Sequence, residues 1–353
     1  MKDRQKSTIY DIAALAGTSA STVSYALNGS WQKRRIKQET VDRIQRIARE
    51  SGYQVNLQAR GLRKARSGLA GMILPEHDTR FFSDLSQAFA LEVRARGNCP
   101  AIVLSGRGAT DQEASVRQLL SYNVDKIVIA AATDPLPLSA ICREAGVPMV
   151  FVDHPCPDAP SVVTDNRLGA QTLTRRILTR MKPARPGDPS SHIYFLGGDA
   201  GLPSTEQRIA GFEDVTREAD ALYDSEQIIA CGYVAQKAEA ELAALRNRLG
   251  RLPAGLFINS ILCFEGVVKY LATVPEAEIQ QTVLGCFDFG PFGVLLRFPV
   301  MMVRQRAEVL IDEAFAQLDK GQNGPSLTCI PPELVDERAA QPLVASPQNA
   351  CLD

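Results

Sequence analysis

The sequence predicts an all-α helix-turn-helix head at the N-terminus, followed by an α/β body with two doubly wound parallel sheets. Three observations lead to this prediction. Three short amphipathic helical patterns fill the first 52 residues. From Leu69 onward, near-continuous apolar strands alternate with amphipathic helices, which is typical of parallel sheets. The alternation restarts after SVVTDN, so we expect two lobes in series.

Composition places the chain among soluble globular proteins. Its 353 residues predict two or three domains, and 45% hydrophobic with 22% charged residues is ordinary. No apolar run reaches the roughly 18–20 residues of a membrane span, and the charged N-terminus lacks the apolar core of a secretory signal. We therefore expect a cytoplasmic protein. Eight well-separated cysteines and three histidines predict reduced thiols, with no disulfide framework, metal site or cofactor.

The formal net charge of −1 hides a division along the chain. Residues 1–66 carry 14 Lys and Arg against 5 Asp and Glu, whereas the remainder carries 25 against 35. A basic head on an acidic body suggests that the head alone contacts a polyanion. A solvated basic surface without a partner is the alternative at this point.

The head contains three predicted helices. Apolar residues from Ile9 to Ala16 form a helical stripe that Gly17 ends. Ser19 is placed to cap a second helix from about Ala20 to Asn28, and a third helix is expected from about Gln38 to Ser51. A short helix with a small polar outer face after a glycine turn is the helix-turn-helix pattern.

Longer stretches make this pattern specific. TIYDIAALAGTSASTVSYALNG and RIARESGYQVNLQARGLRKARSG resemble the N-terminal part of LacI-family transcription regulators, and the similarity continues over nearly the whole chain. Within the family, SYALNG, QKRR, ARGLR and FPVMMVRQRAEV resemble the fructose-repressor or catabolite repressor-activator type. The resemblance implies a DNA-binding head, a hinge, and a body of the periplasmic-binding-protein type I fold with a ligand between its lobes.

The resemblance also assigns DNA contacts. Positions that face base edges are occupied by Ala20, Ser21 and Tyr25, and positions that hold phosphates by Tyr10, Ser19, Thr22, Ser24 and Asn28. Tyr25 could instead cap the core of the head. The basic loop supplies phosphate attraction through Lys33, Arg34, Arg35 and Lys37, while Trp31 beside it is expected to pack rather than stack on a base.

A hinge helix is implied after Tyr53. The resemblance places Ala59 and Leu62 in the minor groove, where Leu62 wedges between base pairs and bends the duplex. Gly61 weakens such a helix by about 1 kcal/mol, which fits a helix that forms only on DNA.

Ligand contacts are expected where strands end, because ligands of doubly wound folds bind at the carboxyl ends of strands. Residues at such places that also match family positions for sugar contacts are Asp153, Ser204, Arg208, Ser260 and Asp288. Each acid could instead be a satisfied structural residue. The loop of His77, Asp78, Thr79, Arg80 and Phe81 is a further expected edge, in which Arg80 either holds a phosphate or faces solvent.

One departure from the family pattern bears on the ligand. Many members have Ala-Asn-Asp where this chain has Ile258-Asn259-Ser260, and the loss of one carboxylate makes the pocket less hostile to an anion. We therefore predict a sugar-phosphate effector such as fructose 1-phosphate or fructose 1,6-bisphosphate, in a repressor of carbohydrate or central carbon metabolism. The alternative is a LacI-family regulator of another carbohydrate, a purine or no small molecule.

The expected domains are a head over residues 1–55, a hinge over 56–68, a body over 69–338 and a flexible tail over 339–353. Within the body, the N-lobe is expected at about 69–164 and 291–322, and the C-lobe at about 165–290 and 323–338. Chain crossings are predicted near Val163–Asn166, Phe287–Pro291 and Lys320–Leu327. The tail lacks a heptad pattern, which favours a homodimer.

Two other classes of protein are disfavoured. A transport solute-binding protein fits neither the basic head nor the N-terminus. An enzyme is disfavoured because GGDAGLP is no G-x-G-x-x-G, and no P-loop or G-x-S-x-G elbow occurs. The expected partners are therefore operator DNA, an effector and a second copy of the chain, with no membrane.

Overall fold

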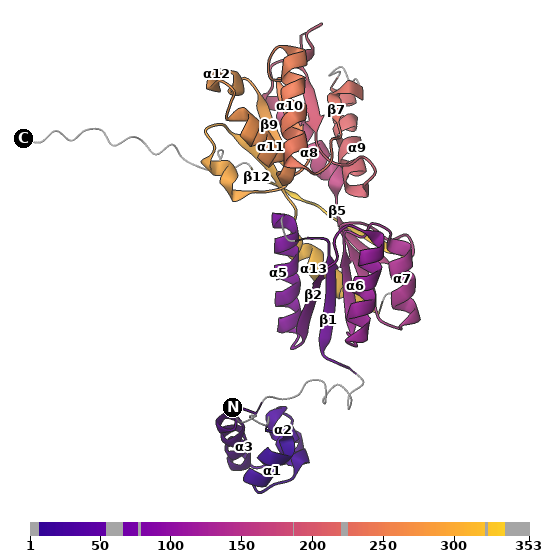
Figure 1. Ribbon diagram of the computed structural model, residues 1–353, viewed down its shortest axis with the longest axis vertical. Helices are drawn as coiled ribbons and strands as arrows, with labels where there is room; N and C mark the ends of the chain where they lie inside the picture. The colour runs from indigo at the N-terminus through magenta and orange to yellow at the C-terminus, as the bar shows by residue number, and fades with distance from the viewer. Residues whose placement is uncertain are drawn as a thin grey trace, which may run out of the picture. The chain divides into compact units, whose positions relative to one another are not determined.

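The computed structural model describes residues 7–53, 66–76, 79–185, 187–219, 225–321 and 324–335. The chain divides into two compact units, a head over residues 1–67 and a body over 68–353. Figure 1 shows the helical head and the two α/β lobes of the body. No helix among the described residues is long and apolar enough to cross a membrane.

The head folds as the sequence predicts. It contains α1 (Ile9–Leu15), α2 (Ala20–Leu27), a 3-10 turn η1 (Gln32–Arg34) and α3 (Gln38–Glu50). Thr8 and Asp11 form a reciprocal capping box at the start of α1, and Gly17, at φ 58°, ends that helix. The buried apolar residues of the three helices form one small core: Ile12, Ala13, Ala16, Val23, Ala26, Val41 and Ile44.

The N-lobe is a six-stranded parallel sheet in the order β11-β5-β4-β3-β1-β2. Its strands are β1 (Leu69–Leu74), β2 (Cys99–Leu104), β3 (Lys126–Ala130), β4 (Met149–Val152), β5 (Pro160–Thr164) and β11 (Ser326–Ile330). Its helices are α5 (Arg80–Ala95), α6 (Ala109–Ser121), α7 (Pro135–Glu144) and α13 (Ala307–Asp319). α5 and α13 pack on one face of the sheet, where Phe89 contacts Phe315, and α6 and α7 cover the other.

The C-lobe repeats this design. Its order β12-β10-β9-β8-β6-β7 is parallel apart from β12, which runs antiparallel to β10. The strands are β6 (Ile193–Leu196), β7 (Ile228–Ile229), β8 (Gly255–Ile258), β9 (Val283–Phe287), β10 (Val300–Arg304) and β12 (Glu333–Val335). The helices are α8 (Asn166–Arg180), α9 (Pro203–Glu218), α10 (Ala235–Leu249), α11 (Ile261–Leu271) and α12 (Glu276–Ile279), with short 3-10 turns η2 (Pro189–Ser191), η3 (Ser225–Gln227) and η4 (Pro291–Leu295). α8 and α9 cover one face, and α10 and α11 the other.

The chain crosses between the lobes three times. The first crossing follows β5, as predicted. The second lies at residues 305–306, because β10 pairs in parallel with β9 and therefore still belongs to the C-lobe. The third lies at residues 331–332, because β11 pairs with β5 in the N-lobe. The lobe limits near 291 and 323 and the crossings near Phe287–Pro291 and Lys320–Leu327 were therefore wrong.

The cysteines that the structure describes are free thiols. Burial raises the pKa of Cys142 to about 12, so that thiol stays protonated at neutral pH.

Candidate functional site

The outward face of α2 presents small hydroxyl side chains. Ser19 caps the helix by accepting a hydrogen bond from the Thr22 amide at 3.2 Å. Its Oγ also lies 2.8 Å from Ser21 Oγ and 2.9 Å from Thr22 Oγ1, so three hydroxyls gather at the start of the helix. Such a cluster at a helix N-terminus suits phosphate oxygens.

The other predicted DNA-facing residues lie on the same unit. Tyr10 is 68% exposed on α1, and Lys33, Arg34 and Arg35 are exposed in and after η1. The Asn28 amide donates to Ser24 Oγ at 3.1 Å. Trp31 is half-buried against the head core, as predicted. Ala59 and Leu62, the minor-groove residues of the expected hinge, lie outside the described residues.

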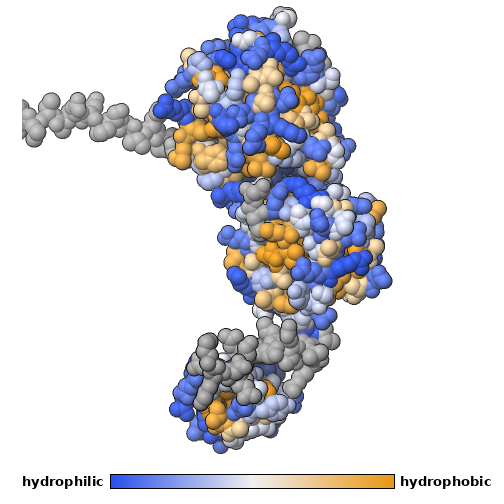
Figure 2. Space-filling view, in the orientation of Figure 1, coloured by the Kyte–Doolittle hydropathy of each residue, from blue (hydrophilic) through white to orange (hydrophobic). Residues whose placement is uncertain are grey.

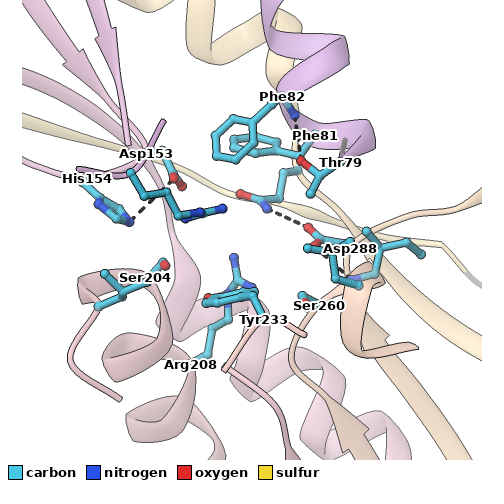
Figure 3. Close-up of a pocket in the computed structure, with 15 residues that line it drawn as sticks. Thr79, Phe81, Phe82, Asp153, His154, Ser204, Arg208, Tyr233, Ser260 and Asp288 are labelled. Carbon is cyan, nitrogen blue, oxygen red and sulfur yellow. Dashed lines mark hydrogen bonds and ion pairs between the residues drawn. The ribbon is translucent and has the colours of Figure 1, made fainter. Parts of the chain in front are cut away.

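A second site lies between the two lobes of the body. The space between its lining side chains, part of it open to solvent, measures about 490 Å³ (Figure 3). The lining comes mostly from residues that follow the carboxyl ends of strands: Thr79, Phe81, Phe82, Arg107, Asp153, His154, Leu202, Ser204, Arg208, Tyr233, Ser260, Ile261, Leu262, Asp288 and Gln305.

One carboxylate from each lobe faces this cavity. Asp153 follows β4 and Asp288 follows β9, and both have positive φ angles, 74° and 132°. Non-glycine residues adopt such angles only when their surroundings impose them, and these conformations concentrate at functional sites. The His154 Nδ1 lies 3.0 Å from the Ala132 carbonyl, which leaves Nε2 toward Asp153, 3.7 Å from its Oδ2.

Asp288 sits in a hydrogen-bonded network. Its Oδ1 accepts from Gln305 Nε2 at 2.7 Å, and its Oδ2 accepts from the Ile261 amide at 3.2 Å. Burial raises the pKa of this carboxyl above its usual value, although the charge of Arg208 and the hydrogen bond from Gln305 oppose that shift. A hydroxyl-bearing ligand can supply a further donor to this acid.

Arg208 is held rigidly on the C-lobe side. It is 3% exposed; Nε donates to Asn166 Oδ1 at 2.8 Å, and Nη1 donates to the Asn259 carbonyl at 2.7 Å. Its guanidinium also stacks on Phe287, 3.8 Å from the ring centroid. Within the described ranges Nη2 has no protein hydrogen-bond partner, and Figure 3 shows the end of the side chain directed into the cavity.

The structure brings most of the predicted ligand contacts together. Asp153, Ser204, Arg208, Ser260 and Asp288 line one cavity, as do Thr79 and Phe81. Ser260 additionally caps α11 by accepting from the Cys263 amide at 3.3 Å. His77 and Asp78 lie outside the described residues.

Arg80 does not line the cavity, so its predicted place there is corrected. It is the first residue of α5 and pairs with Asp84 one turn later, at 3.4 Å. Its guanidinium lies 5.9 Å from the Phe289 ring of the C-lobe. The cavity arginine of the N-lobe is instead Arg107, which also pairs with Glu76.

Sequence reasoning also missed His154, Tyr233 and Gln305. Arg107 follows β2 and His154 follows the last residue of the VPMVFVD strand, so the rule for strand ends could have found both. Tyr233, whose hydroxyl lies 2.7 Å from Thr205 Oγ1, follows the two-residue strand β7 and gives a weaker signal. In the part of the chain that the structure describes, no cluster of three His, Cys, Asp or Glu residues could hold a metal ion.

Curated relatives with substantial similarity include bacterial repressors and regulators. The ribitol operon repressor of Klebsiella aerogenes is 42% identical over 194 residues, which cover 55% of this chain and 71% of that protein. The sucrose operon repressor of Klebsiella pneumoniae is 31% identical over 271 residues, covering 75% and 77%. The catabolite repressor/activator of Salmonella typhimurium is 26% identical over 343 residues, covering 91% and 95%.

Solved structures share the fold. The lac repressor dimer bound to operator and the anti-inducer ONPF matches with a TM-score of 0.77 at 19% identity, covering 94% of this chain and 98% of that one. The Cra regulator of Pseudomonas putida in complex with fructose 1-phosphate matches with a TM-score of 0.65 at 20% identity, covering 76% and 98%.

Two family profiles divide the chain as the fold does. The profile described as bacterial regulatory proteins, lacI family, matches residues 8–56, and the periplasmic binding protein domain matches residues 70–288. The predicted fold, a helix-turn-helix head with a periplasmic-binding-protein type I body, is thereby confirmed. The chain belongs to the LacI family of bacterial regulatory proteins: it is a DNA-binding transcriptional regulator and not an enzyme.

Proposed function

We propose that this protein is a dimeric transcriptional repressor whose affinity for operator DNA is set by a neutral polyhydroxy compound, a sugar or sugar alcohol, bound between its lobes. The observation that carries the proposal is the pair of strained acids, Asp153 and Asp288, that face one cavity from opposite lobes. A ligand with several hydroxyls bonds both acids and so holds the two lobes together. Operator affinity then changes through the different lobe arrangements that the ligand and the DNA favour.

The charge pattern supports a neutral ligand over an anionic one. Two carboxylates face the cavity, and a phosphate beside either one meets like-charge repulsion. Nε and Nη1 of Arg208 already donate hydrogen bonds to protein acceptors, so Nη2 is left to donate to a hydroxyl oxygen. Phe81 and Phe82 add an apolar wall suited to the C–H face of a sugar. The 42% identical relative is named for ribitol, a compound of this class.

A fructose phosphate is the second candidate, and a specific observation favours it. Arg107 and Arg208 enter the cavity from different lobes and can hold a phosphate between them. The match over 91% of the chain to a catabolite repressor/activator and the fold match to a complex with fructose 1-phosphate support the same candidate. In this case the protein is a regulator of the fructose-repressor type.

On the DNA side, the proposal assigns base contacts to Ala20, Ser21 and Tyr25 and phosphate contacts to Tyr10, Ser19, Thr22, Ser24, Asn28, Lys33, Arg34 and Arg35. The exposed position of most of these side chains supports the assignment. Ala59 and Leu62 are proposed to enter the minor groove, where Leu62 opens the central step. Leu62→Ala is then expected to reduce DNA bending, which gel mobility of circularly permuted fragments measures.

The exposed apolar surface supports a homodimer. Leu91 of α5 and Ile102 and Leu104 of the edge strand β2 are 57%, 36% and 53% exposed. Figure 2 shows apolar surface on the N-lobe in the area where Figure 1 draws α5 and β2. Neighbouring apolar side chains on an edge of this kind mark an interaction surface. A second copy of the chain, related by a twofold axis, covers α5 and β2 together.

Calorimetric titration of the full-length protein tests the ligand. Ribitol, sucrose, fructose 1-phosphate, fructose 1,6-bisphosphate and a purine are titrated in turn, with and without operator. Heat from a neutral sugar or sugar alcohol that Asp288→Asn abolishes supports the leading proposal. Heat from fructose phosphates alone selects the second candidate, and binding of the purine alone contradicts both. Asp84→Asn, a change of the same charge at a residue outside the lining, is the control and is expected to bind as wild type.

A further inference from the structure

We propose that Arg34, held over the ring of Tyr25, reads a guanine in the major groove and so determines part of the operator sequence. This inference rests on the DNA contacts proposed above for the head. It assigns Arg34 a role in base recognition in addition to the phosphate attraction that its charge alone predicts. The two residues come from different elements, the second helix of the head and the turn that follows it.

The outward face of α2 lacks long donors of its own. Ala20 and Ser21 are too small to reach far into a groove, and Ser21 Oγ is engaged with Ser19 Oγ at 2.8 Å. Tyr25 lies four residues after Ser21 and therefore on the same face, one turn further along the helix. A side chain that stacks on Tyr25 thus stands beside the face that is presented to the bases.

Arg34 meets this condition. Its guanidinium carbon lies 4.8 Å from the centroid of the Tyr25 ring, within the range of a cation–π contact. The Arg34 side chain is exposed, and no carboxylate among the described residues pairs with it. The stack restricts the rotamers of a long side chain before DNA arrives, which lowers the entropy lost on binding, and it leaves the N–H donors at the guanidinium edge available.

The turn that carries Arg34 is fixed to the head. Trp31 and Ile36 at its two ends both pack against the core of the head. The Arg34 amide donates to the Trp31 carbonyl at 3.1 Å, and the Ile36 amide donates to the same oxygen at 3.2 Å. Arg35 between them has a φ of 54°, a left-handed conformation that a non-glycine residue adopts at a cost. The turn therefore positions the Arg34 backbone firmly.

The chemistry selects guanine. A planar guanidinium donates two parallel hydrogen bonds to O6 and N7 of guanine, the commonest specific contact in the major groove. Lysine carries the same charge but is a point donor without the planar fork, so it cannot reproduce the stacked bidentate arrangement. Lys33, the preceding residue, is exposed and has no ring contact among the described residues, which makes it a matched comparison.

The test begins with selection of preferred duplexes from a random pool by the full-length protein. Competition binding then compares each base pair of the selected half-site for wild type, Arg34→Lys, Arg34→Ala and Lys33→Ala. Wild type is expected to prefer G at one position in each half-site by about 5- to 150-fold, the value of one bidentate contact. Arg34→Lys and Arg34→Ala lose that preference. Lys33→Ala weakens every sequence alike.

The outcomes separate this inference from the proposed function. A G preference that survives in Arg34→Lys or Arg34→Ala overturns the inference and leaves the DNA-binding function intact. Equal loss of the preference in Lys33→Ala also overturns it, because the charge of the turn is then what matters. A wild-type protein that selects no sequence contradicts the proposed function and the inference with it. Equal melting temperatures of the variants establish that the head remains folded.

Discussion

The side-chain amide of Gln305 donates a 2.7 Å hydrogen bond to Oδ1 of Asp288 and thereby ties a cavity acid to the second crossing between the lobes. The Oε1 of the same Gln305 accepts from Thr164 Oγ1 at 2.8 Å, at the first crossing. One buried side chain thus connects the candidate ligand site to two of the three segments that join the lobes. A ligand that displaces or strengthens the bond to Asp288 would act directly on these connections.

Gln305→Leu is expected to lower both stability and ligand affinity. The change leaves Thr164 Oγ1 without this partner and removes a donor from Asp288, which costs about 1–3 kcal/mol. Denaturant unfolding and calorimetry measure the two effects. Gln317→Leu is the matched control, because Gln317 is 2% exposed and bonds Thr328 and Ser326 inside the N-lobe. It should lose stability without loss of ligand affinity; equal effects on affinity would refute the coupling.

Asp288 is expected to make the protein less stable as pH rises. Its pKa is raised by burial, so the folded carboxyl keeps its proton to a higher pH than the unfolded one, whose value is 3.8. The stabilisation is complete below pH 3.8 and is lost as pH rises through the folded pKa. Above pH 3.8, the unfolding midpoint of ligand-free wild type should therefore fall more with rising pH than that of ligand-free Asp288→Asn. Parallel profiles would contradict the raised pKa.

Arg208→Ala is expected to weaken the ligand by about 10- to 150-fold, because a charge-assisted hydrogen bond contributes about 1.5–3 kcal/mol. Operator affinity without ligand should change little, which gives a regulator that no longer responds. Operator titrations with and without ligand measure both quantities. Arg80→Ala, at an arginine that does not line the cavity, should retain the response. A normal response in Arg208→Ala would remove the residue from the site.

Two substitutions at Ser19 separate its structural role from its contact with DNA. Ser19→Ala removes the cap of α2 and should destabilise the head by about 1 kcal/mol. Ser19→Asp restores a capping acceptor and should recover most of that stability, but its charge repels a phosphate. Thermal unfolding is expected to rank Asp above Ala, whereas operator affinity is lowered in both. Tight operator binding by Ser19→Asp would show that no phosphate lies near this position.

Low pH is expected to weaken one ion pair of the C-lobe, that between Glu278 and Arg246. Glu278 accepts two hydrogen bonds from Arg246, at 2.8 and 2.7 Å, and one from the Leu252 amide at 2.8 Å. The hydrogen bond from Arg246 lowers the pKa of Glu278 below 4.5, so its stabilisation is present above pH 4.5 and is lost as pH falls through the folded pKa. Glu278→Gln should cost about 1 kcal/mol at neutral pH and little in acid. Glu218→Gln, in an exposed pair with Arg175, should cost less at both.

Local patterns predicted the elements well. The sequence pattern predicts a helix over residues 235–249, and α10 has the same bounds, because its apolar stripe, its glycine stop and its helix formers all agree. The head helices end within one or two residues of their predicted ends for the same reason. Sites that follow directly from strand ends, such as Asp153 and Asp288, were likewise predictable.

What depends on strand pairing could not be predicted from local pattern. VMMV in β10 fits a strand of either lobe, and only its register with β9 assigns it to the C-lobe. Gln305 directly follows β10, so its place in the cavity lining also depends on that strand pairing. The prediction for Arg80 was wrong for a related reason. Tertiary packing decides whether a side chain at the start of a helix turns into the cavity or toward Asp84.

The second crossing has a consequence for how the protein is made. A ribosome releases the chain from its N-terminus, and domains of a nascent chain fold as their sequence emerges. The N-lobe cannot finish folding as its first strands emerge, because α13 and β11 leave the exit tunnel only after the C-lobe strands up to β10. Until then the core around Phe89 lacks Leu310 and Phe315. The half-built N-lobe is therefore the stage at which a growing chain most needs protection by a chaperone.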